Sequence, residues 1–187
     1  MEKVGVLALQ GSFAEHLAIL RRIPGSEPLE VKTAAQLEAV DRLIIPGGES
    51  TAIGKLLRKT GMLSLLQKRI GEGLAVWGTC AGLILLAREI VGEEPYLAAM
   101  DIKVRRNAYG GQLDSFRAEQ IIPAISANAI PLVFIRAPWI EAVGPEVEVL
   151  AERDGRVIAA RQGRLLATSF HPELTQDTSV YEYFLQM

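Results

Sequence analysis

The sequence has one cysteine, two histidines and no positive net charge. A single cysteine cannot form an intramolecular disulfide, which excludes the disulfide framework of a small secreted protein. The 20 Lys and Arg residues against 22 Asp and Glu residues give a formal net charge of -2, which supplies no positive field for a nucleic-acid backbone or an anionic membrane. We therefore expect neither a nucleic acid nor a membrane as a partner.

Long apolar runs, linkers and repeats are also missing from the sequence. No apolar stretch approaches the ~20 residues that a membrane-spanning helix needs. The first residues contain a six-residue apolar run with no cleavage-site pattern behind it, so we expect a cytoplasmic protein. Its 187 residues, 49% of them hydrophobic, suit one compact domain over 1–187 with a core of its own.

Short apolar runs alternate with helical periodicity along the first half of the chain. This alternation is typical of parallel strands buried on both faces and joined by crossover helices. The predicted strands cover 4–9, 29–32, 42–46 and 74–78, and the predicted helices cover 12–22, 33–40, a pair within 51–70, and 83–91. Ser12 and Glu15 have the spacing of a capping box at the start of the first helix.

The last third of the chain has a different pattern. Runs at 147–152, 157–161 and 165–170 read as strands separated by Asp-Gly and Gln-Gly pairs, which are hairpin signals. The sequence therefore predicts an α/β protein whose mostly parallel central sheet is joined by an antiparallel C-terminal meander.

The one cysteine lies between a predicted strand and a predicted helix, in the segment GTCAG at 78–82. This is the form of a nucleophile elbow with cysteine in place of serine. Its two glycines permit a sharp turn that places the sulfur at the carboxyl end of the sheet, and the start of the next helix favours a thiolate. A lone cysteine is more often a small buried core residue. The strand-turn-helix context favours Cys80 as a nucleophile.

A thiolate nucleophile needs a base, and His16 and His171 are the two candidates. His171 precedes Pro172, which biases it toward extended geometry, where His171 and Glu173 point to the same side. Glu173 would then fix the tautomer of the imidazole. Taken alone, the segment also fits a strand-end turn with a solvated glutamate. We interpret His16 as an exposed or packing histidine.

Acyl transfer from an amide also needs hydrogen-bond donors for the developing oxyanion, and backbone N–H groups are a preorganised source. Ala81, directly after the cysteine, and Gly48, in the loop PGGEST at 46–51, can supply them. The loop also fits a helix-capping turn with Ser50 or Thr51 at the N-cap. The two interpretations are compatible.

The segments PGGEST, GTCAGLILLA and FHPELT, in this order and at these spacings, resemble the class I (triad) glutamine amidotransferases. The segments ALQG followed by Glu15-His16, MDIKVRRNAYG and FIRAP narrow the resemblance to the SNO/PdxT family, the glutaminase subunits of pyridoxal 5'-phosphate synthase. The resemblance spans essentially the whole chain. It implies a flavodoxin-like three-layer sandwich.

The resemblance also implies roles for individual residues. Cys80 would form a glutamyl thioester, with His171 and Glu173 completing a triad. Glutamine would be bound by Gly47, Gly48, Glu49, Arg106, Ile135 and Arg136. An arginine suits a free α-carboxylate because its guanidinium pairs bidentately. Gln10 and Gly11 resemble a segment near the oxyanion site that responds to the synthase subunit.

The resemblance further implies that ammonia passes to a synthase subunit in a hetero-oligomer, and we expect neither a cofactor nor a metal. Two alternatives remain open: the subunit of another triad amidotransferase such as imidazole glycerol phosphate synthase, and a non-catalytic binding module on the same fold. Gly111, Arg117 and Tyr181 depart from the family pattern, in which Arg, Glu and His are usual. We expect these departures to affect the surface beside the glutamine pocket and the partner contact.

Overall fold

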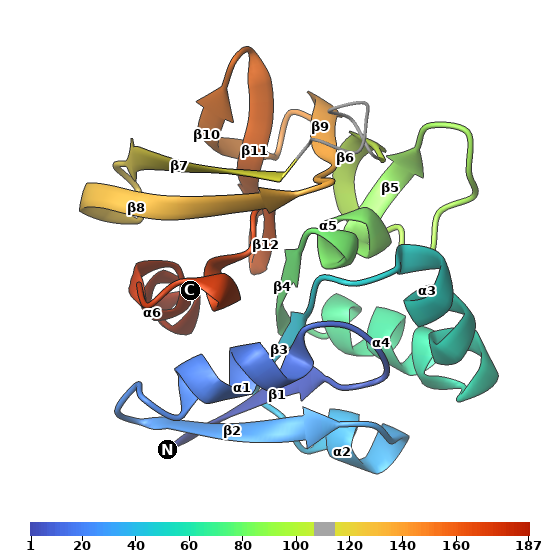
Figure 1. Cartoon of the computed structure of the whole chain (residues 1–187). Helices are drawn as coiled ribbons and strands as arrows, with labels where there is room; N and C mark the ends of the chain where they lie inside the picture. The colour runs from blue at the N-terminus through green and yellow to red at the C-terminus, as the bar shows by residue number, and fades with distance from the viewer. Residues whose placement is uncertain (107–114) are drawn as a thin grey trace.

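The computed structural model describes residues 1–106 and 115–187 (Figure 1). Within these residues one ten-stranded sheet has the order β2-β1-β3-β4-β12-β11-β9-β6-β5, with β10 paired to β11. Its parallel part consists of β1 (Glu2–Leu7), β2 (Ser26–Val31), β3 (Arg42–Ile45), β4 (Ala75–Thr79) and β12 (Leu165–Thr168). The four strands expected in the first half are therefore confirmed, with some ends displaced.

Helices cover both faces of the parallel part. They are α1 (Phe13–Leu20), α2 (Ala34–Glu38), α3 (Ser50–Lys59), α4 (Met62–Gly71), α5 (Ala81–Leu86) and α6 (Ser179–Gln186). Alternate residues of a strand pack into two different hydrophobic cores, because successive side chains of a strand point to opposite faces of the sheet. Val76 packs with residues of α2 to α5, whereas Ala75 and Trp77 pack with α1 and α6. The result is the expected three-layer α/β sandwich.

Beyond β12 the sheet continues mainly with antiparallel pairs, and its last two strands pair in parallel. Strands β10 (Glu148–Arg153), β11 (Arg156–Gln162) and β12 form the expected meander, and Asp154, Gly155 and Gly163 adopt the positive φ angles that its tight turns need. The sheet continues through β9 (Trp139–Val143), β6 (Met100–Arg105) and β5 (Ala87–Ile90), while β7 (Ser115–Ile122) and β8 (Ser126–Ile135) form a separate hairpin. None of β5 to β9 was predicted from the sequence.

Three local predictions are wrong. The helix expected over 83–91 ends at Leu86, because the next four residues pair with β6 as strand β5. Ser12 precedes α1 but makes no capping hydrogen bond. Its hydroxyl donates instead to Glu173. The N-cap of α3 is Glu49 rather than Ser50 or Thr51, and it has no side-chain cap.

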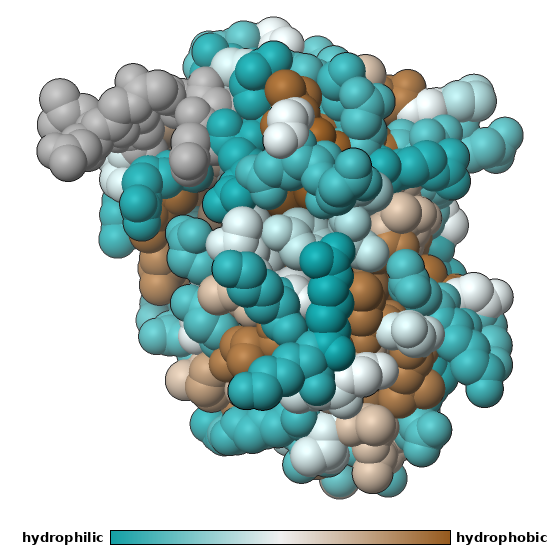
Figure 2. Space-filling view, turned by 90° about the vertical axis from the view of Figure 1, so that its right-hand side faces the viewer, coloured by the Kyte–Doolittle hydropathy of each residue, from teal (hydrophilic) through white to brown (hydrophobic). Residues whose placement is uncertain are grey.

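One face of the molecule is shown in Figure 2. Hydrophilic side chains predominate on it, and hydrophobic ones appear there as separate patches. Within 1–106 and 115–187, no helix is both long enough and apolar enough to span a bilayer.

Candidate active site

Cys80 lies at the junction of β4 and α5, at the carboxyl end of the parallel strands. Its backbone angles, φ 50° and ψ -101°, are strained for a non-glycine residue, as in a nucleophile elbow. The Cys80 N–H donates to the Thr168 carbonyl at 2.8 Å and ties the elbow to β12. A Cβ on Gly78 would lie 2.4 Å from the Gly82 backbone, and one on Gly82 would lie 2.1 Å from the Ile45 carbonyl oxygen. The turn therefore requires both glycines.

His171 and Glu173 meet directly after β12. The His171 Nδ1 atom and the Glu173 Oε1 atom are 2.7 Å apart, and both side chains are buried. The expected extended segment is wrong, because Pro172–Leu174 forms a 3-10 helix that folds Glu173 back onto the ring. The His171 N–H donates to the Val133 carbonyl at 2.8 Å. Among residues 1–106 and 115–187, Nε2 has no hydrogen-bond partner, and it stays available to the sulfur.

The surroundings of His171 and Glu173 favour the charged form of each side chain. Burial alone would lower the pKa of His171, but the Cys80 side chain and the Glu173 carboxylate raise it from 6.5 to about 10. Burial alone would raise the pKa of Glu173, but His16, His171 and the Ser12 hydroxyl lower it from 4.5 to about 2. An imidazolium beside an ionised carboxylate is therefore the stable form near neutral pH.

These shifts predict how stability depends on pH. The raised pKa of His171 adds stability that is complete below pH 6.5 and is lost as the pH rises through about 10. The lowered pKa of Glu173 adds stability that is complete above pH 4.5 and is lost as the pH falls through about 2. Urea unfolding of His171→Gln should show a flatter decline between pH 6.5 and 10 than the wild type. Equal alkaline slopes would contradict the assignment.

The loop between β3 and α3 packs directly against this pair. A Cβ on Gly47 would lie 2.5 Å from His171 Cε1 and 3.4 Å from Cys80 Cβ. Gly11, with φ 102°, contacts the same loop, because its Cβ would lie 1.9 Å from the Gly47 carbonyl oxygen. The Gln10 Oε1 atom accepts a hydrogen bond from the Glu49 N–H at 2.9 Å. The structure thus brings the Gln10-Gly11 segment onto the glycine loop.

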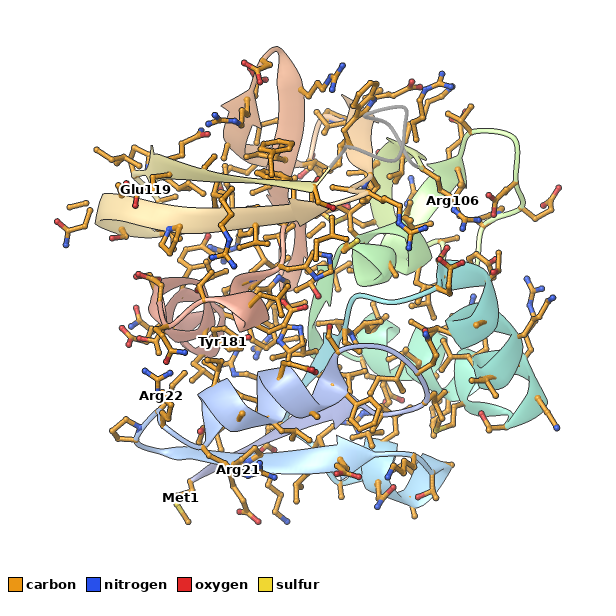
Figure 3. The ribbon with its side chains drawn as sticks, in the orientation of Figure 1. Met1, Arg21, Arg22, Arg106, Glu119 and Tyr181 are labelled. Atoms are coloured by element: carbon orange, nitrogen blue, oxygen red, sulfur yellow. The ribbon has the colours of Figure 1, made fainter. Side chains whose placement is uncertain are left out.

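A cavity of about 260 Å³ opens above the sulfur. Its lining includes the predicted Gln10, Gly48, Glu49, Cys80, Ala81, Arg106, Ile135, Arg136 and His171. Gly47 and Gly11 lie behind this wall and Glu173 behind His171. Arg106, which is labelled in Figure 3, is held at the rim by Glu93 at 2.7 Å and lies 3.8 Å from Glu49. The rim therefore carries both signs of charge.

Ser50 and His16 are among the groups at this site that sequence reasoning missed. Ser50 also lines the cavity, and its buried hydroxyl has no hydrogen-bond partner in the part of the chain that the structure describes. His16, interpreted as a packing or exposed residue, is fully buried and lies 3.5 Å from the Glu173 carboxylate. The pairing of Glu15-His16 with ALQG was a family signal, but nothing local to it indicates a contact with residue 173.

The family departures fall in different places. Tyr181, on α6, is fully buried, and its hydroxyl lies 2.8 Å from His16 Nδ1 on α1. Arg117 is exposed on β7. Gly111 lies outside the described residues.

Cys80, on a strained elbow, lines the same cavity as His171, which pairs with Glu173 behind it. On this sheet, the arrangement is that expected of a class I glutamine amidotransferase. The model of the SNO glutamine amidotransferase family matches residues 6–187, and the chain belongs to that family. A Chloroflexus aggregans protein named pyridoxal 5'-phosphate synthase subunit PdxT is 57% identical, over 98% of this chain and 99% of that protein.

Two further proteins are similar to this chain over nearly its whole length. A protein of the same name from Caldanaerobacter subterraneus subsp. tengcongensis is 54% identical, over 99% of this chain and 98% of that protein. A solved structure described as a glutamine amidotransferase is 48% identical and superposes with a TM-score of 0.92, covering 98% of this chain and 97% of that one.

Proposed function

We propose that this chain hydrolyses L-glutamine to L-glutamate and ammonia, and passes the ammonia to the synthase subunit of pyridoxal 5'-phosphate synthase. The observation that carries the proposal is the placement of the strained Cys80 elbow and the 2.7 Å His171–Glu173 pair around one cavity. The relatives named as pyridoxal 5'-phosphate synthase subunits support the choice of partner.

The charged rim of the cavity suits a free amino acid. The Arg106 guanidinium would pair with the α-carboxylate of glutamine, and the Glu49 carboxylate with its α-ammonium group, since both residues line the cavity. The amide end of the substrate then reaches the sulfur. The neighbouring backbone N–H groups of Ala81 and Gly48 supply the oxyanion donors.

The chemistry follows from the charges of the resting site. The Cys80 thiolate attacks the amide carbon, and the oxyanion collapses to a thioester as the His171 imidazolium protonates the leaving ammonia. The neutral imidazole next takes a proton from water, whose oxygen attacks the thioester. Glutamate leaves, and the thiolate and imidazolium are restored. Glu173 holds the ring in the tautomer that presents Nε2 to the sulfur.

Glutamate formation with and without the cognate synthase subunit tests this function. We expect turnover to rise when that subunit is added, because the Gln10-Gly11 segment packs on the glycine loop and resembles a family segment that responds to the synthase subunit. The cyclase subunit of an imidazole glycerol phosphate synthase is the matched control and should give no increase. Turnover stimulated by the cyclase alone would favour the other amidotransferase, and no turnover with either subunit would contradict the proposal.

A further inference from the structure

A buried chain of polar groups lies behind Glu173, on the side away from the cavity. Glu173 Oε1 already accepts hydrogen bonds from the Ser12 hydroxyl and from His171, each at 2.7 Å. Glu173 Oε2 is fully buried and has no hydrogen-bond partner among the described residues, and His16 Nε2 lies 3.5 Å from it. An ionised oxygen in this position needs a donor, because burying a charge without one is costly.

His16 is the group that faces this oxygen. Its Nε2 atom also lies 3.2 Å from the Thr79 hydroxyl, and its Nδ1 atom lies 2.8 Å from the Tyr181 hydroxyl. His16, Thr79 and Tyr181 are all fully buried. The His16 ring is fixed edge-on to Trp77 at 5.9 Å. The ring therefore has one geometry and two possible tautomers.

The Tyr181 hydroxyl decides between the tautomers. Burial raises the pKa of Tyr181 well above 10, and the Glu173 charge raises it further, so the phenol keeps its proton. Burial lowers the pKa of His16 below 6.5 against the opposing charge of Glu173, while His171 lowers it and Glu15 raises it slightly. A phenol that donates to Nδ1 leaves the proton of a neutral His16 on Nε2, which faces the Thr79 hydroxyl at 3.2 Å and Glu173 Oε2 at 3.5 Å. The reverse tautomer would aim a nitrogen lone pair at a buried carboxylate.

We infer that His16, kept in its Nε2–H tautomer by the Tyr181 hydroxyl, is a positioning residue that holds the Glu173 carboxylate in the orientation required by His171. The inference rests on the proposed glutaminase function for its kinetic consequence. Tyr181 comes from the last helix, His16 from the first, and the two meet where α6 packs against α1 (Figure 3). The C-terminal helix thereby becomes part of the support for the site.

Substitutions separate this role from simple packing. Tyr181→Phe removes only the hydroxyl and should lower kcat for glutamine about 2- to 10-fold with KM unchanged, the range expected for one hydrogen bond between neutral groups. Tyr183→Phe is the matched control, because it makes the same change on α6 at a hydroxyl bonded to Arg161, away from the site. His16→Gln, which keeps an N–H donor near the Nε2 position, should retain more activity than His16→Leu.

The pH profile of kcat/KM and nitrogen NMR both distinguish a positioning role of His16 from simple packing in the core. In His16→Leu the pKa of Glu173 should rise, so the acid-side loss of kcat/KM should shift to higher pH. Nitrogen NMR of the wild type should show His16 protonated on Nε2 alone, and the two histidines make assignment simple. Tyr181→Phe should lose that preference.

An Nδ1–H tautomer in the wild type, or equal kcat for His16→Leu and His16→Gln in folded proteins, would overturn the inference. If the wild type with its synthase subunit shows no glutamine turnover, the proposed function fails, but the NMR result still decides the role of His16.

Discussion

Cys80→Ala is expected to reduce glutamine hydrolysis by roughly 10⁴-fold or more in the presence of the synthase subunit, because the substitution removes the nucleophile that forms the thioester. The alanine can adopt the same strained backbone at position 80, where φ is 50°, since its side chain is no larger than that of cysteine. Folding should therefore survive. Steady-state glutamate release measures the effect.

The controls for Cys80→Ala are the stability of the variant and its binding to the synthase subunit. The variant should unfold at a similar urea concentration to the wild type and should still bind the synthase subunit. Substantial glutamine turnover by a folded, partner-bound Cys80→Ala protein would exclude Cys80 as the nucleophile. A variant that failed to bind the partner would place Cys80 in the interface instead.

Gly47→Ala is expected to lower kcat by roughly 10²- to 10⁴-fold, the range associated with a misplaced acid-base group. The new methyl group would lie 2.5 Å from His171 Cε1 and 3.0 Å from Nδ1, so the ring must move. That movement breaks the 2.7 Å contact with Glu173 and carries Nε2 away from the sulfur. The measurement is kcat at saturating glutamine with the synthase subunit bound.

Gly71→Ala is the matched control for this substitution. A Cβ at position 71, at the end of α4, would meet no atom within 4 Å. It should therefore leave kcat unchanged. Wild-type turnover in Gly47→Ala would show that the glycine loop does not constrain His171, and an equal loss in Gly71→Ala would show that the effect is not local.

Much of the fold is predictable because its signals are local. Buried parallel strands appear as short apolar runs, and the turns of the meander are marked by glycine. The helix over 83–91 was predicted too long because the pairing of Ala87–Ile90 with β6 is a contact between separate segments. Periodicity within one segment contains no information about such a partner.

The same distinction separates the site residues that sequence reasoning finds from those it misses. Cys80 is identifiable because the glycines that shape its turn are two residues away on each side. His171 and Glu173 are two residues apart along the chain. They therefore lie close together in space, although the backbone between them is helical rather than extended. Ser12 and His16 reach Glu173 across more than 150 residues, as the 161-residue separation from Ser12 shows. Their roles depend on packing that only the structure reveals.

The central claim is that Cys80 attacks the side-chain amide of glutamine, and covalent trapping tests it most directly. The complex with the synthase subunit would be treated with a diazo-ketone analogue of glutamine, which alkylates a nucleophile irreversibly, and then digested for mass spectrometry. We predict a single adduct on the peptide that contains Cys80, suppressed by excess glutamine and absent in Cys80→Ala. Inactivation with the adduct on another residue, or continued glutamine turnover by fully alkylated Cys80, would contradict the mechanism.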